Sequence, residues 1–77
     1  MKARLCYYHD KQQLRFVAYE AQTLGALKAL VRQASAYVTH VDVYLGEQPC
    51  RFKARIRRIN GAFWWAQLER CFAEYHA

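Results

Sequence analysis

The sequence has little proline or glycine and no long apolar run. One proline and three glycines in 77 residues argue against a disordered segment or linker, because such segments are rich in both. No stretch approaches the ~20 apolar residues of a transmembrane helix. The first residues, MKARLCYYHDK, lack the apolar run of a signal peptide. We therefore predict a folded cytoplasmic protein without a membrane partner.

Motifs for catalysis and cofactor binding are also missing. The sequence has no Gly-rich phosphate loop, no HExxH and no GxSxG. His40 and Asp42 could touch on one strand face, but such a pair needs a nucleophile and an oxyanion hole to act in catalysis. We predict a protein that is not an enzyme and needs no cofactor; a ribonuclease using His40 is the weaker alternative.

The three cysteines, Cys6, Cys50 and Cys71, are far apart and odd in number. They form no CxxC pair. Three thiols cannot all pair within one chain. We interpret them as reduced core thiols and predict no metal site.

Acidic residues are scarce. Six Asp and Glu face twelve Lys and Arg, which gives a net charge of +6. This charge predicts an acidic partner: nucleic acid, an acidic protein surface or a nucleoprotein complex. The length predicts one domain, residues 1–77, and the 55% hydrophobic content is sufficient for its core.

Hydrophobic periodicity predicts the order β-β-α-β-β-β-α. Thr23 is a predicted helix N-cap, residues 9–13 are a predicted polar turn, and Asn60-Gly61 predicts a type I′ hairpin turn. Residues 62–76 allow strand or helix, and we choose a short strand followed by a helix to about residue 76. We predict an α+β domain whose antiparallel sheet has one or two helices packed on one face. The predicted strands are 2–8, 14–21, 36–45, 50–59 and 62–66, and the first helix is 24–35.

The stretch CRFKARIRRING, residues 50–61, predicts a row of cations on one side of a strand. Alternate strand residues are ~6.8 Å apart, and like charges in such a row repel unless an acidic group relieves them. The arginines favour bidentate contacts to phosphate or carboxylate, whereas the alternative is solubility and protection of a sheet edge. We call this set the basic row: Arg51, Lys53, Arg55 and Arg57.

Aromatic residues follow the hairpin turn. Neighbouring strand residues point to opposite sides, so one of Trp64 and Trp65 could lie beside the basic row and stack on a base. The interpretation that we favour places both in the core, one under each helix. Tyrosines could also lie half exposed on the open sheet face: Tyr7, Tyr8, Tyr19 and Tyr44. The candidate binding residues are the basic row with Arg58, Trp64 and Trp65.

Two stretches together, YEAQTLGALKALV and ARIRRINGAFWWA, resemble small phage-borne α/β proteins of the type I anti-CRISPR kind. The resemblance covers about half of the chain. It implies a protein of the host cell cytoplasm that acts without catalysis. Such proteins bind a crRNA-guided complex, often at surfaces that would otherwise hold DNA.

We therefore expect a small basic binding protein, most concretely an inhibitor that grips a nucleoprotein complex through the basic row. One alternative is a protein that binds DNA or RNA directly. Another is a structural homo-oligomeric module, since an open sheet with spare aromatic residues can be buried against a copy of itself. A homodimer belongs to this set of expectations.

Overall fold

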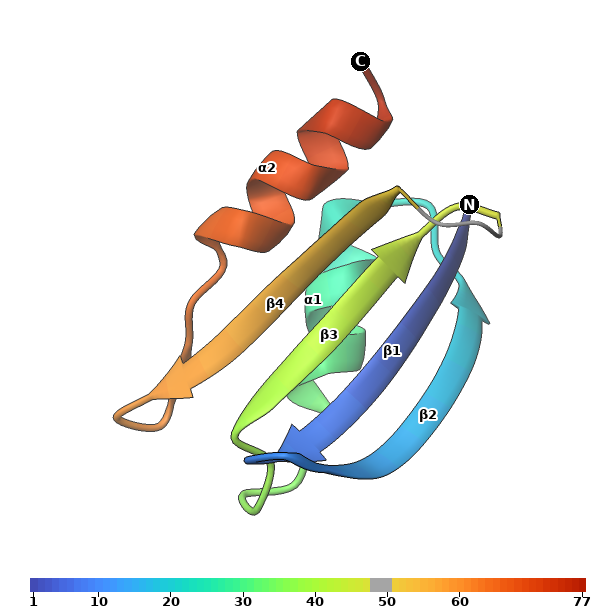
Figure 1. Cartoon of the computed structure of the whole chain (residues 1–77). Helices are drawn as coiled ribbons and strands as arrows, with labels where there is room; N and C mark the ends of the chain where they lie inside the picture. The colour runs from blue at the N-terminus through green and yellow to red at the C-terminus, as the bar shows by residue number, and fades with distance from the viewer. Residues whose placement is uncertain (48–50) are drawn as a thin grey trace.

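The computed structural model describes residues 1–47 and 51–77. It confirms the predicted α+β class: five antiparallel strands form one sheet in the order β2-β1-β3-β4-β5, with two helices (Figure 1). The strands are β1 Lys2–His9, β2 Gln12–Glu20, β3 His40–Leu45, β4 Phe52–Ile59 and β5 Ala62–Phe63, and the helices are α1 Leu24–Arg32 and α2 Ala66–Tyr75.

Both hairpin turns are tight. Asn60 and Gly61 have φ of 52° and 79°, which confirms the hairpin turn, since a type I′ turn needs positive φ at both positions. The turn between β1 and β2 is shorter than predicted, because His9 already pairs with Gln12. Asp10 has φ of 52° there, a conformation that Asp tolerates better than most residues.

Three predicted strand boundaries were wrong. Residues 36–39 form no strand and belong to the loop after α1. The apolar residue that suggested a strand there, Val38, is 4% exposed because it anchors this loop in the core. The strand predicted over 62–66 ends at Phe63, because Ala66 begins α2 and its turns bury Leu68 and Cys71. The strand predicted from residue 50 begins at Phe52, and Cys50 lies outside the described residues.

The two helices cover the same side of the sheet. Leu27 and Val31 of α1 lie in one buried cluster with Leu68 and Cys71 of α2 and the inward residues of the strands. Figure 1 shows α1 across one face of the sheet and α2 alongside β4. As predicted, Thr23 caps α1, and its Oγ1 accepts a hydrogen bond from the Ala26 N–H at 3.1 Å. The opposite side of the sheet carries no helix in the described part of the chain.

Neither helix within residues 1–47 and 51–77 is long and apolar enough to cross a membrane. Cys6 is 6% exposed, on the side of the sheet away from the helices, and Cys71 is equally buried in the core.

Candidate functional site

The side of the sheet opposite α1 and α2 is called the open face. Residues that pair directly across strands share a side of the sheet, so the register of β2, β1, β3 and β4 defines this face. Its side chains form three cross-strand rows that mix cations with rings: Ala18–Arg4–Tyr44–Lys53, Phe16–Cys6–Asp42–Arg55 and Gln13–Tyr8–His40–Arg57.

Three of the four members of the basic row lie on the open face. Lys53, Arg55 and Arg57 are exposed and alternate with Ala54 and Ile56, which are fully buried. This alternation confirms the strand geometry predicted for the row. Arg51 is exposed and directly precedes β4.

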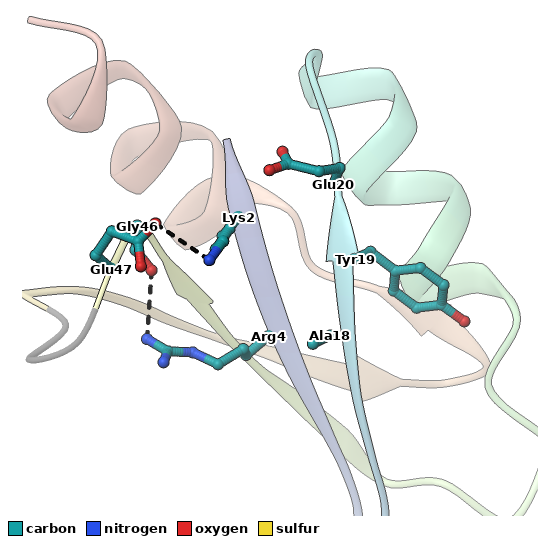
Figure 2. Close-up of a pocket in the computed structure, with 7 residues that line it drawn as sticks. All are labelled: Lys2, Arg4, Ala18, Tyr19, Glu20, Gly46 and Glu47. Carbon is teal, nitrogen blue, oxygen red and sulfur yellow. Dashed lines mark hydrogen bonds and ion pairs between the residues drawn. The ribbon is translucent and has the colours of Figure 1, made fainter.

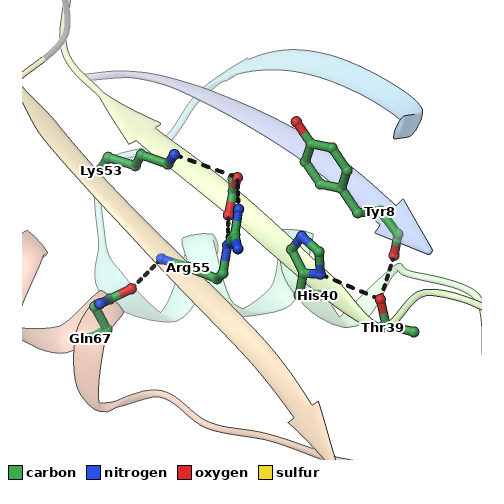
Figure 3. A network of polar contacts seen from close by, with 7 residues as sticks. Tyr8, Thr39, His40, Lys53, Arg55 and Gln67 are labelled. Atoms are coloured by element: carbon green, nitrogen blue, oxygen red, sulfur yellow. Dashed lines mark hydrogen bonds and ion pairs between the residues drawn. The ribbon is translucent and has the colours of Figure 1, made fainter. Parts of the chain in front are cut away.

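A buried carboxylate lies beside the row. The Asp42 side chain is 2% exposed; its Oδ1 accepts a hydrogen bond from Arg55 Nε at 2.9 Å and its Oδ2 one from Nη2 at 3.2 Å. Lys53 Nζ lies 3.8 Å from the same carboxylate (Figure 3). The hydrogen bonds that Arg55 donates to Asp42 raise the pKa of the Arg55 guanidinium. The protein therefore relieves part of the repulsion within its own basic row.

Asp42 balances one of the three cations that β4 places on the open face, so two of their positive charges remain unbalanced. The side chain of Arg57 has no hydrogen bond or ion pair within the described part of the chain, so its guanidinium is available to a ligand. Its cross-strand neighbour His40 stacks on Tyr8, with ring centres 4.8 Å apart, and its Nδ1 lies 3.3 Å from Thr39 Oγ1. Burial, and then the charge of Arg55, lower the pKa of His40. His40 therefore binds a proton less readily than a free imidazole, and the Asp42 carboxylate is engaged by Arg55.

Two of the candidate residues serve the molecule's own packing. Arg58 donates hydrogen bonds from Nη1 to the carbonyls of Ser35 and Val38, at 2.7 and 3.0 Å, so it anchors the loop after α1. Its guanidinium lies 4.3 Å from the centre of the Phe63 ring. Trp65 is partly buried against the core, as the favoured interpretation had it.

Trp64 is different: its side chain is 60% exposed. The expectation that both tryptophans are core is therefore wrong for Trp64. The physical reason is that β5 ends at Phe63, so Trp64 lies in the junction to α2. Its backbone N–H donates to the Arg57 carbonyl at 2.9 Å, and it lines a hollow together with Arg55 and Arg57. An exposed indole thus lies beside the basic row.

Of the four tyrosines expected on the open sheet face, two lie there, whereas Tyr19 pairs with Ala3 on the core side of the sheet. Tyr8 and Tyr44 lie half-buried on this face, whereas Tyr7 is on the core side, 3% exposed, and donates its hydroxyl to the Leu30 carbonyl at 2.7 Å. Phe16 of the edge strand β2 is 52% exposed. Alternation gives the side of each residue within its own strand, but only the register shows which strands are neighbours.

A larger hollow, of about 490 Å³, lies at the far end of β1 and β2. Arg4 donates to the Gly46 carbonyl at 3.4 Å, and Lys2 pairs with Glu47 at 3.4 Å (Figure 2). Its cations are thus already engaged by neighbouring groups, and it is a weaker candidate for an anion than the region around Arg57.

Residues 1–47 and 51–77 contain no group of three His, Cys, Asp or Glu side chains that could hold a metal ion. Comparisons with protein-family models, with curated proteins and with solved structures gave no significant match. The open face is the candidate functional site.

Proposed function

We propose that the protein binds single-stranded nucleic acid, without catalysis, on the open face. The observation that carries the proposal is the position of Lys53, Arg55 and Arg57 on a helix-free sheet surface whose neighbouring strands supply rings. Proteins that bind single strands combine a cationic track for the backbone with aromatic side chains on which bases stack. The open face contains both components.

The dimensions of the surface suit a short single strand. From β2 to β4 there are three inter-strand spacings of ~4.8 Å, or ~14 Å, and Phe16 and Trp64 lie towards opposite edges of the sheet. Flexible, unstacked bases can reach half-buried rings such as Tyr8 and Tyr44, whereas the paired bases of a duplex cannot. We therefore expect single strands to bind more tightly than a duplex of the same sequence.

The test is fluorescence anisotropy with a labelled single strand of about 12 nucleotides, an amount that a domain of this size can cover. Because Asp42 offsets one of the three cations, two net charges are available to phosphates. The logarithm of the binding constant should therefore fall with the logarithm of salt concentration at a slope of about −1.4. Charge reversal at Arg57 (R57E) should weaken binding and flatten the slope.

The matched control is R15E. Arg15 pairs with Tyr7 and so lies on the helix side of β2, and its reversal changes the net charge equally. If R15E weakens binding as much as R57E, only the overall charge matters and the open face is not the site. Absence of binding by the wild-type protein at low salt would refute the proposal as a whole.

The inhibitor of a crRNA-guided complex remains a narrower prediction based on the resemblance. It would use the same basic row against an acidic protein surface or guide RNA. A pull-down with and without nuclease separates the two, because a protein partner stays bound after the nucleic acid is digested.

A homodimer that buries Phe16 and its neighbours would compete with nucleic acid, and sedimentation with and without the oligonucleotide would show this.

A further inference from the structure

Arg57 lies between two hollows on the open face. The first has a volume of about 370 Å³ and the second about 310 Å³, each within the range of small-ligand sites. Arg55, Arg57 and Ile59 line both, so the hollows adjoin along β4. The first is completed by Asp10, Thr39, His40 and Arg58, and the second by Trp64, Ala66 and Gln67.

The second hollow has the chemistry of a base-binding site. Its wall is the indole of Trp64, 60% exposed, with the aliphatic side chains of Ile59 and Ala66 beside it. The backbone that carries this indole is held against β4, because the Trp64 N–H donates to the Arg57 carbonyl at 2.9 Å. The side chain of Gln67 accepts a hydrogen bond from the Arg55 N–H, which ties the start of α2 to the same strand.

The first hollow has the chemistry of a phosphate site at its Arg57 end. The Arg57 guanidinium has no partner among the described residues, whereas Arg55 is oriented by Asp42 at 2.9 Å. Asp10, at the opposite turn, is the carboxylate of this hollow, and it lies 3.6 Å from His9. A phosphodiester between Arg57 and Arg55 would balance one of the two charges that Asp42 leaves uncompensated.

We infer that these two hollows hold one nucleotide unit of the bound strand, with its phosphate on Arg57 and its base stacked on Trp64. The inference rests on the proposed function and deepens it, because it selects one anchoring position within the open face. Stacking strength then sets a modest preference, so a purine should be favoured over a pyrimidine at this position.

The experiment uses the full chain and the same labelled strand, with W64A and W64F as variants. Loss of one base stack should weaken binding about 5- to 140-fold in W64A, and W64F should recover part of it. The control is Y37A, since Tyr37 is equally exposed (58%) but stacks on His9 and lines neither hollow. Thermal melting shows that each variant is folded, which we expect because both side chains are largely in solvent.

Intrinsic fluorescence gives a second readout on the wild-type protein. Adenosine 5′-monophosphate should quench the exposed indole, and W64F should lose this quenching while Trp65 still emits. Wild-type affinity in W64A, together with weaker binding by R57E, would overturn the inference and leave the proposed function intact. Failure of the wild-type protein to bind the strand would overturn both.

Discussion

The substitution Asp42→Asn should have opposite effects on stability and on binding. The carboxylate is 2% exposed and receives two hydrogen bonds from Arg55, with Lys53 Nζ at 3.8 Å. Hydrogen bonds to charged groups contribute ~1.5–3 kcal/mol. The cations are 42% and 49% exposed, so water can solvate them after the change, and we expect a loss of about 2 kcal/mol. For a domain of this size that lowers Tm by roughly 8–16 °C.

The same change should strengthen binding of a single strand. Without the carboxylate, Arg55 is free to contact a phosphate, which makes the salt slope steeper by about 0.7. Thermal melting and anisotropy titrations at several salt concentrations measure the two effects on one sample. Glu74→Gln is the control, since Glu74 is exposed, has no ion pair among the described residues, and its replacement changes the net charge equally. A folded Asp42→Asn variant that binds more weakly than wild type would refute this reasoning, because Asp42 would then be needed to present Arg55.

Three further predictions concern single residues. The pKa of His40 is lowered from 6.5 in the folded protein, so the unfolded chain binds the proton first as pH falls. The wild-type protein should therefore lose stability between about pH 7 and pH 5. His40→Asn should lose less over the same range, as measured by urea unfolding at each pH. Gly61 has φ of 79°, and Gly61→Ala should cost ~1–2 kcal/mol of unfolding free energy; an unchanged midpoint would contradict the strain. Gly25 lies in helix α1, where an added Cβ would meet only Thr23 Oγ1 at 3.9 Å, so Gly25→Ala should stabilise by ~0.5–1 kcal/mol in the same assay.

The sequence predicted the side on which each strand residue lies better than it predicted which residues pair between strands. Strand alternation placed Lys53, Arg55 and Arg57 on one side correctly, and Asn60-Gly61 fixed the last hairpin, because both depend on residues adjacent in the chain. Asp42 appeared only as a partner for His40. Its contact with Arg55 depends on the register of β3 against β4, and no local pattern encodes that register.

Trp64 shows a second limit of sequence reasoning. A strand continuing to residue 66 would have placed the two tryptophans on opposite sides of the sheet. Each was then expected to be buried under a helix. The strand stops at Phe63 because α2 begins three residues later. The burial of Leu68 and Cys71 satisfies the apolar side of α2, and Trp64 is left in solvent at the junction.

The arrangement of the sheet bears on why the basic row exists. Cations protect an exposed strand edge from pairing with another chain, and that explanation requires the row to lie on such an edge. β4 instead lies between β3 and β5, and where β5 does not reach, the Arg55 N–H is satisfied by Gln67 of α2. The edge strands are β2 and the two-residue β5, and Arg15 is the one cation within them. The cations are therefore concentrated on an inner strand and not on the edge strands of the sheet. The repulsion left after Asp42 is a cost that binding of an anionic ligand would remove.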